Sequence, residues 1–366
     1  MANEVKTIML MLTEHCNLNC RYCYEKNKSL KTMTYSTAID ILSNELNIDD
    51  GFEQCEIQFF GGEPFLEFEL IKKICDFLWS NKWNKNYYCF VTTNGTVLTN
   101  EIKNWLTEHK DEFICALSLD GNKKAHDINR CNSYDMIDKD FFKKTWPFQP
   151  AKMTISPESL PFLADSVIEL HDSGWAFDNN LAYGVDWSLP ILKNELYNQL
   201  KLLSDYYIEN PKVKLCRLLN GQLANILSDE KVKRWCGAGT SLKSYDVDGK
   251  CYPCHLFAPI STDRSYNLIM NFSELNGEQN LMDKKCEDCG IYNICPTCYG
   301  SNYIQNGNFA VRDEYLCANT KTCAIVASYI WIERLSRYTP NELGLSDDEC
   351  IDLLQSSKLI QETLKL

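Results

Sequence analysis

The sequence predicts an α/β protein whose first half is a partial barrel of parallel strands. Short runs rich in β-branched and aromatic residues alternate with helical patterns up to about residue 208, which is the signature of βαβ units. Six strand and helix pairs fit into this stretch, fewer than the eight of a complete TIM barrel. We therefore expect an open, TIM-like (β/α)6 barrel with its active site at the carboxyl ends of the strands, where parallel α/β folds place their chemistry.

The expected elements follow one another in strict alternation. Strands are expected at 7–12, 56–60, 87–93, 113–119, 152–156 and 180–187. Helices are expected near 35–47, 67–80, 99–109, 135–145, 159–172 and 190–208. We expect a barrel over 1–208, a helical connector over 209–235, a cysteine-rich domain over 236–320 and C-terminal helices over 321–366.

Composition excludes several classes of protein. The chain has 366 residues, 45% of them hydrophobic, so it can bury a large core. Its net charge of -13 argues against nucleic acid as a partner, because nucleic-acid binders usually display basic patches. No apolar stretch approaches the roughly 20 residues that span a bilayer, and the N-terminus lacks the features of a signal peptide. We expect a cytoplasmic protein with no membrane partner.

The 19 cysteines are the strongest compositional signal. Cytosolic thiols are kept reduced, so a disulfide framework is not expected. Three cysteines lie within residues 16–23 and eight more lie within 236–317, mostly at short spacings. Such clustering is typical of metal ligands. Seven of the remaining eight, Cys55, Cys75, Cys89, Cys115, Cys131, Cys216 and Cys350, fit small core residues.

The first cysteine motif directly follows the first expected strand. It reads Cys16-Asn-Leu-Asn-Cys20-Arg-Tyr-Cys23, a C-x3-C-x2-C arrangement in a polar loop. Three thiolates can bind three irons of a cubane and leave the fourth iron open, as catalytic metal sites keep an open position. The alternative is a zinc site completed by His15, which is badly placed because it is adjacent to Cys16.

This motif, with Tyr22 beside its last cysteine, resembles that of the radical S-adenosylmethionine (SAM) superfamily. The resemblance implies a [4Fe–4S] cluster on Cys16, Cys20 and Cys23 whose open iron binds SAM. It also implies an oxidoreductase that cleaves SAM reductively to a 5′-deoxyadenosyl radical. An external one-electron donor such as flavodoxin or ferredoxin would supply the electron.

Short motifs also follow the next three expected strands. They are Gly61-Gly62-Glu63-Pro64, Thr93-Asn94-Gly95, and Ser118-Leu-Asp120-Gly121 with the downstream His126-Asp-Ile-Asn-Arg130. Asn94-Gly95 alone could be a plain turn. In their places these segments resemble the GGE, TNG, SLDG and HDxxR segments of radical SAM enzymes. The resemblance implies that Glu63 binds the SAM amino group and that Ser118 and Arg130 hold its carboxylate. The implied SAM-binding residues are Tyr22, Gly61, Gly62, Glu63, Pro64, Asn94, Ser118, Asp120 and Arg130.

The second cysteine region resembles the SPASM domain, which holds auxiliary clusters. Its cysteines are Cys236, Cys251, Cys254, Cys286, Cys289, Cys295, Cys298 and Cys317. These are enough for two further [4Fe–4S] clusters. The pattern departs from that of the family at Cys295-x2-Cys298, where three intervening residues are usual, which puts Cys298 in doubt. Structural zinc sites are the alternative, and such a chain would be a zinc-stabilised binding protein with no redox chemistry.

The resemblance also implies how the auxiliary ligands divide. Cys236, Cys254 and Cys298 would hold the first auxiliary cluster, with Cys251 as the candidate fourth ligand. If Cys251 does not reach it, an open iron remains that could bind a substrate thiol. The second cluster would take Cys286, Cys289, Cys295 and Cys317. Cys323 competes with Cys317 for the last position.

SPASM-bearing enzymes resemble one another in acting on peptides or proteins, so we expect a ribosomally made precursor peptide as the substrate. The leading hypothesis is thioether formation between a cysteine sulfur and a carbon radical. The alternatives are formylglycine formation in sulfatases, carbon–carbon crosslinking and epimerisation. Sulfatase maturases carry a catalytic aspartate directly after the cysteine that corresponds to Cys254. This chain has His255 there, a candidate catalytic base.

Overall fold

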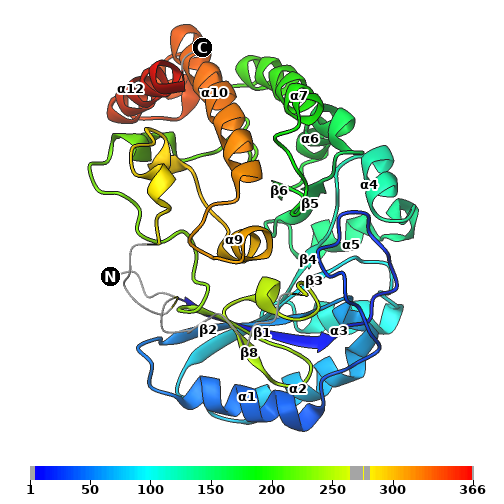
Figure 1. Cartoon of the computed structure of the whole chain (residues 1–366). Coiled ribbons are helices and arrows are strands. Elements are labelled where there is room, and N and C mark those ends of the chain that lie inside the picture. The colour runs from blue at the N-terminus through cyan, green and yellow to red at the C-terminus, as the bar shows by residue number, and fades with distance from the viewer. Residues whose placement is uncertain (1–4, 264–274, 276–280, 365–366) are drawn as a thin grey trace. The chain divides into compact units, whose positions relative to one another are not determined.

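A six-stranded sheet with the strand order β4-β3-β2-β1-β7-β8 joins the first third of the chain to a later hairpin (Figure 1). The structure is a computed structural model that describes residues 5–263, 275 and 281–364. The strands are β1 (Val5–Thr13), β2 (Gln54–Gly61), β3 (Asn86–Thr93), β4 (Phe113–Leu117), β7 (Leu242–Tyr245) and β8 (Cys251–Tyr252). Strands β1 to β4 and β7 run parallel, whereas β8 is antiparallel to β7. A second sheet pairs β5 (Ala151–Ile155) with β6 (Phe177–Leu181).

Helices connect these strands and form the C-terminal end. The α-helices are α1 (Tyr35–Asn47), α2 (Phe68–Ser80), α3 (Asn100–Glu108), α4 (Lys123–Asn129), α5 (Lys139–Thr145), α6 (Leu163–Asp172), α7 (Pro190–Glu209), α9 (Tyr299–Asn306), α10 (Glu314–Arg337), α11 (Pro340–Leu343) and α12 (Asp347–Leu364). The 3-10 helices are η1 (Pro64–Glu67), η2 (Tyr134–Met136), η3 (Leu160–Phe162), η4 (Leu223–Leu227), η5 (His255–Phe257), η7 (Lys284–Cys286) and η8 (Tyr292–Ile294).

Two compact units share the chain, and each is assembled from several segments. The first contains Met1–Leu119, Arg130–Ala151 and Cys236–Gln279. The second contains Asp120–Asn129, Lys152–Trp235 and Asn280–Leu366. The four consecutive domains expected from the sequence stay predictions.

The core of the first unit lies between its sheet and its helices. Ile8 and Leu10 of β1 are fully buried and stand opposite Ile57 and Phe59 of β2. Figure 1 shows α1 and α2 along one side of this sheet, and α1 turns Leu42 and other apolar residues inward. Removal of such side chains from water is the main favourable term in folding. The parallel register aligns the carboxyl ends of β1 to β4 at one edge.

In the second unit, α10 packs against α7 and α12. Its Arg334 is buried and donates hydrogen bonds to the carbonyl oxygens of Tyr207, Asn210 and Val213. Carbonyl groups at a helix C-terminus have no partner within the helix. Arg334 therefore ties the end of α7 to α10.

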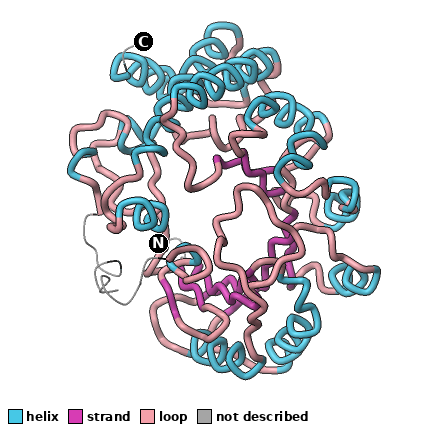
Figure 2. The backbone as a smooth tube through the Cα atoms, turned by 45° about the vertical axis from the view of Figure 1, so that its right-hand side comes forward, coloured by secondary structure: helices cyan, strands magenta, loops and turns pink. Residues whose placement is uncertain are grey.

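Several elements differ from those expected. The predicted sixth strand lies earlier, as β6, and α4 is an additional helix of one to two turns. Where we expected a helical connector over 209–235, residues 210–235 are turns and loop apart from η4, drawn mostly pink in Figure 2. Pro211 and Gly221 fall there and disfavour a continuous helix. In the described part of the chain, the six expected strands are divided between two sheets.

No helix within the described ranges is both long enough and apolar enough to cross a membrane.

Candidate active site

Cys16, Cys20 and Cys23 share the loop that follows β1, and all three are half-buried. The loop is held by local hydrogen bonds, because Cys23 N donates to the Cys20 carbonyl at 3.1 Å and Leu18 N donates to Cys16 Sγ at 3.4 Å. Burial raises the pKa of the Cys16 thiol, and the nearby Cys23 adds to this shift. The structure therefore brings the three predicted ligands onto one turn-rich segment.

Two charged residues beside this loop were missed by sequence reasoning. Burial alone would lower the pKa of Lys28, but the thiols of Cys23 and Cys16 outweigh it, and the pKa is raised. Glu25 is buried, and burial raises its pKa to about 7. Its Oε1 has no hydrogen-bond partner among the described residues. Both residues lie in a segment without periodicity, where only their closeness to Cys23 in sequence could have drawn attention to them.

The two glycines after β2 allow this part of the chain to approach the cysteine loop. A Cβ on Gly61 would lie 2.1 Å from the Thr13 carbonyl oxygen, and one on Gly62 would lie 2.3 Å from that of His15. Gly62 N donates to the Thr13 carbonyl at 3.0 Å, and Glu63 N donates to the His15 carbonyl at 2.9 Å. Any side chain here would push the two loops apart. These glycines position Glu63 beside the residue that precedes Cys16.

Glu63 is a buried carboxylate with no ion-pair partner within hydrogen-bond distance among the described residues. Its Oε1 accepts from Thr93 Oγ1 at 2.8 Å and from Phe65 N at 3.2 Å, and its Oε2 accepts from Asn94 N at 2.8 Å. Burial raises its pKa, although these hydrogen bonds and the charge of Arg130 act in the opposite direction. A buried carboxylate of this kind is suited to a cationic ligand.

Arg130, Ser118, Asn94 and Tyr22 gather in the same unit. The guanidinium of Arg130 lies over the Tyr22 ring at 5.3 Å from its centre, and Arg130 is buried. Ser118 N donates to the Thr93 carbonyl, which aligns the ends of β3 and β4. Asn94 Nδ2 donates to Asn17 Oδ1, between Cys16 and Cys20. Pro64 is buried at the start of η1, directly after Glu63.

Asp120 lies in the second unit, and its carboxylate is engaged there. Oδ1 accepts from Thr154 N at 2.9 Å, and Oδ2 accepts from Asn129 Nδ2 at 3.1 Å. The backbone N–H of Asp120 donates to Nδ1 of His126. These contacts stabilise the turn after β4, and a direct contact of Asp120 with SAM stays a prediction.

The segment around Cys254 and His255 docks on the first cysteine loop. Asn27 donates through Nδ2 to the Pro259 carbonyl at 2.9 Å, and its backbone N–H donates to the Ile260 carbonyl. The His255 ring packs against Tyr24 and Phe60, with ring centres 5.2 and 5.0 Å away. Burial lowers the pKa of His255 to about 4, so the ring is neutral at pH 7. Its Nδ1 is buried without a partner in the described ranges.

Cys236 and Cys254 belong to neighbouring loops of the same unit. Gly239 N donates to the Pro253 carbonyl at 3.1 Å, which joins the segment after Cys236 to the one before Cys254. Cys236 is exposed and Cys254 is buried. Cys298 belongs to the second unit, where its sulfur caps α9 by accepting from Ser301 N at 3.4 Å.

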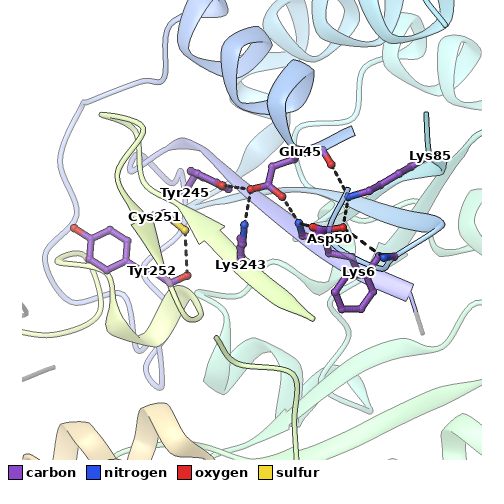
Figure 3. A network of polar contacts seen from close by, with 9 residues as sticks. Lys6, Glu45, Asp50, Lys85, Lys243, Tyr245, Cys251 and Tyr252 are labelled. Carbon is purple, nitrogen blue, oxygen red and sulfur yellow. Dashed lines mark hydrogen bonds and ion pairs between the residues drawn. The ribbon is translucent and has the colours of Figure 1, made fainter. Parts of the chain in front are cut away.

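Cys251 sits in a buried polar network (Figure 3). Its Sγ donates to the Tyr252 carbonyl at 4.0 Å, and its strand partner Tyr245 donates through its hydroxyl to Glu45 Oε1. Glu45 also pairs with Lys243 at 2.7 Å and with Lys6. Asp50 and Lys85 extend the network beyond Lys6. Burial raises the pKa of the Cys251 thiol.

The second unit gathers four cysteines of the predicted second auxiliary set. Burial raises the pKa values of Cys286 and Cys295, and Cys289 and Cys317 both add to these shifts, so the four thiols lie within electrostatic range of one another. Cys323 is buried elsewhere, next to Cys216, and burial raises its pKa to about 12. The arrangement therefore favours Cys317 over Cys323 as a ligand.

Thiols are the donors that iron–sulfur clusters require, and these sites offer them in groups. Within residues 5–263, 275 and 281–364, no group of three or more His, Cys, Asp or Glu side chains is gathered around the position of a single metal ion. The observation that fits an iron–sulfur cluster is therefore the charge that surrounds the thiols. The positive charge of Lys28 near Cys16 and Cys23 would compensate the negative charge of a thiolate-bound cluster held there.

Several known proteins are similar to this chain. A family model for a 4Fe-4S single cluster domain matches residues 6–130. An uncharacterised protein of Methanocaldococcus jannaschii is 30% identical over 250 residues, 61% of this chain and 82% of that protein. The radical SAM cyclopropyl synthase TigE of Paramaledivibacter caminithermalis is 20% identical over 347 residues, 86% of this chain and 72% of that enzyme. A cysteine-type anaerobic sulfatase-maturating enzyme of Clostridium novyi is 24% identical over 361 residues, 85% of this chain and 91% of the enzyme.

The fold is also shared with a solved structure. Native anSMEcpe with bound AdoMet has a TM-score of 0.70 at 20% identity, and the match covers 92% of this chain and 100% of that one. The same protein has been solved with AdoMet and the Kp18Cys peptide, with a TM-score of 0.70 over 88% of this chain and 97% of that one. Because its relatives extend along most of its length and the matched domain carries the three-cysteine loop, the chain belongs to the radical SAM enzymes.

Proposed function

We propose that this radical SAM enzyme modifies a ribosomally made precursor peptide by forming thioether bonds between cysteine sulfur and carbon. Cys16, Cys20 and Cys23 would hold the cluster that binds SAM. When bound, that cluster supplies one electron to the sulfonium of SAM and so generates a 5′-deoxyadenosyl radical. The SPASM-type cysteines would hold two auxiliary clusters.

The residues after β2 to β4 would hold SAM in place. Glu63 would accept hydrogen bonds from the amino group, because it is a buried carboxylate whose raised pKa a cation would offset. Arg130 would bind the SAM carboxylate with its planar fork, oriented by the Tyr22 ring, and Ser118 would assist it.

The single observation that carries the proposal is the docking of the Cys254 segment on the radical-generating loop. Asn27 fixes this segment by hydrogen bonds to Pro259 and Ile260, and Tyr24 contacts His255. A thioether forms only where a sulfur and a carbon radical meet. A thiol bound next to Cys254 would therefore lie beside the loop that carries Cys16, Cys20 and Cys23.

The surroundings of Cys251 support an open iron at the first auxiliary cluster. Its Sγ donates to the Tyr252 carbonyl of the β7–β8 hairpin, opposite Tyr245, whose hydroxyl is hydrogen-bonded to Glu45 of α1. Cys236, Cys254 and Cys298 would then be the protein ligands, and the substrate thiol would take the fourth position. His255, whose buried Nδ1 has no partner among the described residues, would accept the proton of that thiol.

The test uses the reduced anaerobic enzyme, SAM and synthetic peptides encoded by short reading frames beside the gene. Thioether formation predicts the loss of two hydrogens per crosslink and one cysteine fewer that reacts with iodoacetamide. Loss of two hydrogens with every cysteine still reactive would indicate a carbon–carbon bond instead. An unchanged mass with an altered retention time would indicate epimerisation. Either result would overturn the thioether proposal.

Sulfatase maturation is the second candidate, favoured by the similarity to the Clostridium novyi enzyme over 85% of this chain. A peptide that spans the modified cysteine of a sulfatase would then gain an aldehyde, detected with a hydrazide. His255 would have to serve where that family uses aspartate.

A zinc-stabilised binding protein is the alternative from a different class, and metal analysis separates it from the enzyme. Anaerobically purified protein should be brown and contain iron and acid-labile sulfide. A colourless protein with stoichiometric zinc would overturn the assignment of all three clusters. The external electron donor and the cytoplasmic location stay predictions.

A further inference from the structure

Three segments of the second unit carry the cysteines assigned to the second auxiliary cluster. Cys286 and Cys289 lie in and after η7, Cys295 follows η8, and Cys317 lies in the first turns of α10. These segments are distant in sequence, so something other than local structure must hold them together. Arg312 lies two residues before α10 and so is joined to the segment of Cys317 by the chain itself. It also contacts the segment before η7 and the segment after η8.

The contacts of Arg312 reach both sides of the cysteine group. Its Nη2 donates to Cys295 Sγ at 2.7 Å, to the Pro296 carbonyl at 2.8 Å and to the Cys295 carbonyl. Its backbone N–H donates to Asp283 Oδ2 at 2.8 Å. Asp283 in turn accepts from Lys285 N at 2.9 Å and so fixes the start of η7 before Cys286.

The guanidinium of Arg312 is also deeply buried and incompletely satisfied. The residue is 7% exposed, and its Nε has no hydrogen-bond partner among the described residues. A buried N–H donor without an acceptor is costly, so an acceptor is expected beside it. A cluster on the neighbouring thiolates would supply sulfur acceptors and the negative charge that a buried guanidinium requires.

We propose that Arg312 positions the second auxiliary cluster and raises its reduction potential. The inference rests on the proposed function, because it needs Cys286, Cys289, Cys295 and Cys317 to bind that cluster. Reduction adds negative charge to the cluster. A cation that donates a hydrogen bond to a ligand sulfur therefore stabilises the reduced form more than the oxidised form. Lysine would keep the charge but lose the separate Nε–H donor, which has no partner among the described residues and would face the cluster.

The experiment is a redox titration followed by electron paramagnetic resonance. It uses the full chain with Cys16, Cys20 and Cys23 changed to Ala, so that only auxiliary clusters contribute. Arg312→Gln and Arg312→Lys are compared with Lys285→Gln, which removes a cation next to Cys286 that is exposed and paired with Glu314. Iron and sulfide are counted in each variant.

For Arg312→Gln we expect the ratio of reduced to oxidised cluster at a fixed potential to fall at least tenfold, which is 59 mV for one electron. Arg312→Lys should show a smaller fall, and Lys285→Gln none. If Arg312→Gln loses iron, a lowered potential in Arg312→Lys still supports the inference. An unchanged potential in an Arg312 variant with full iron would overturn it. If these four cysteines did not bind a cluster at all, the result would be distinguishable, because Cys286→Ala would then retain all its iron.

Discussion

Replacing Glu45 by Gln should destabilise the first unit more than most single substitutions would. Glu45 is 1% exposed, and its two oxygens face Lys6, Lys243 and the Tyr245 hydroxyl. Neutralising it leaves Lys6, which is also 1% exposed, with Asp50 as its remaining carboxylate. Removing one partner of a buried ion pair costs about 3–5 kcal/mol. We expect the lower end of that range, about 3 kcal/mol, because the amide oxygen can still accept one hydrogen bond.

The assay is urea unfolding of the anaerobic protein, combined with hydrogen exchange of the β7–β8 hairpin. The urea midpoint should fall, and amides at 242–252 should exchange faster, because Glu45 joins that hairpin to α1. The matched control is Lys31→Gln, which breaks an exposed pair with Asp248 on the turn of the same hairpin. It should behave as wild type, since exposed pairs contribute little. An unchanged midpoint and exchange rate in Glu45→Gln would refute the reasoning.

Three further predictions concern pH, SAM binding and iron content. Burial would raise the pKa values of Glu45 and Asp50, but their lysine partners outweigh burial and lower both pKa values. The ion pairs therefore stabilise the fold at neutral pH, and this stabilisation is lost as the pH falls below about 5. Glu45→Gln should lose less unfolding free energy than the unaltered protein over that pH range, and an equal pH dependence of the two would contradict this. Glu63→Gln should weaken SAM binding by about 1.5–3 kcal/mol, roughly 10- to 150-fold, as measured by equilibrium dialysis. An unchanged affinity for SAM would show that Glu63 does not bind it. Cys317→Ala should lose the iron of one cluster and Cys323→Ala should retain it, and the reverse pattern would show that the ligand is Cys323.

The strands and helices around the first cysteine loop were predictable because their patterns are local. The helix expected at 35–47 is α1 with those same bounds, since Thr34 supplies an N-cap and the apolar residues recur at helical spacing. The motifs after β1 to β4 were found by their spacing. Their convergence follows from parallel pairing, which brings the carboxyl ends of neighbouring strands to one edge.

Other features depend on contacts between distant segments and could not be predicted. Strand β7 extends the sheet next to β1, although about 230 residues separate them in sequence. The Asp248-Gly249 pair is a hairpin signal, but nothing local indicates which strand the hairpin joins. Lys28 and Arg312 lie in irregular segments, where no periodicity shows which way a side chain points. Their roles emerge only from the thiols around them.

The central claim is that Cys16, Cys20 and Cys23 bind the cluster that cleaves SAM. The most direct measurement is 5′-deoxyadenosine production by the triple Ala variant, reduced with dithionite and supplied with SAM. The account predicts that the variant makes none while keeping its auxiliary iron, whereas the unaltered enzyme makes the product. Continued production of 5′-deoxyadenosine by the triple variant would contradict it.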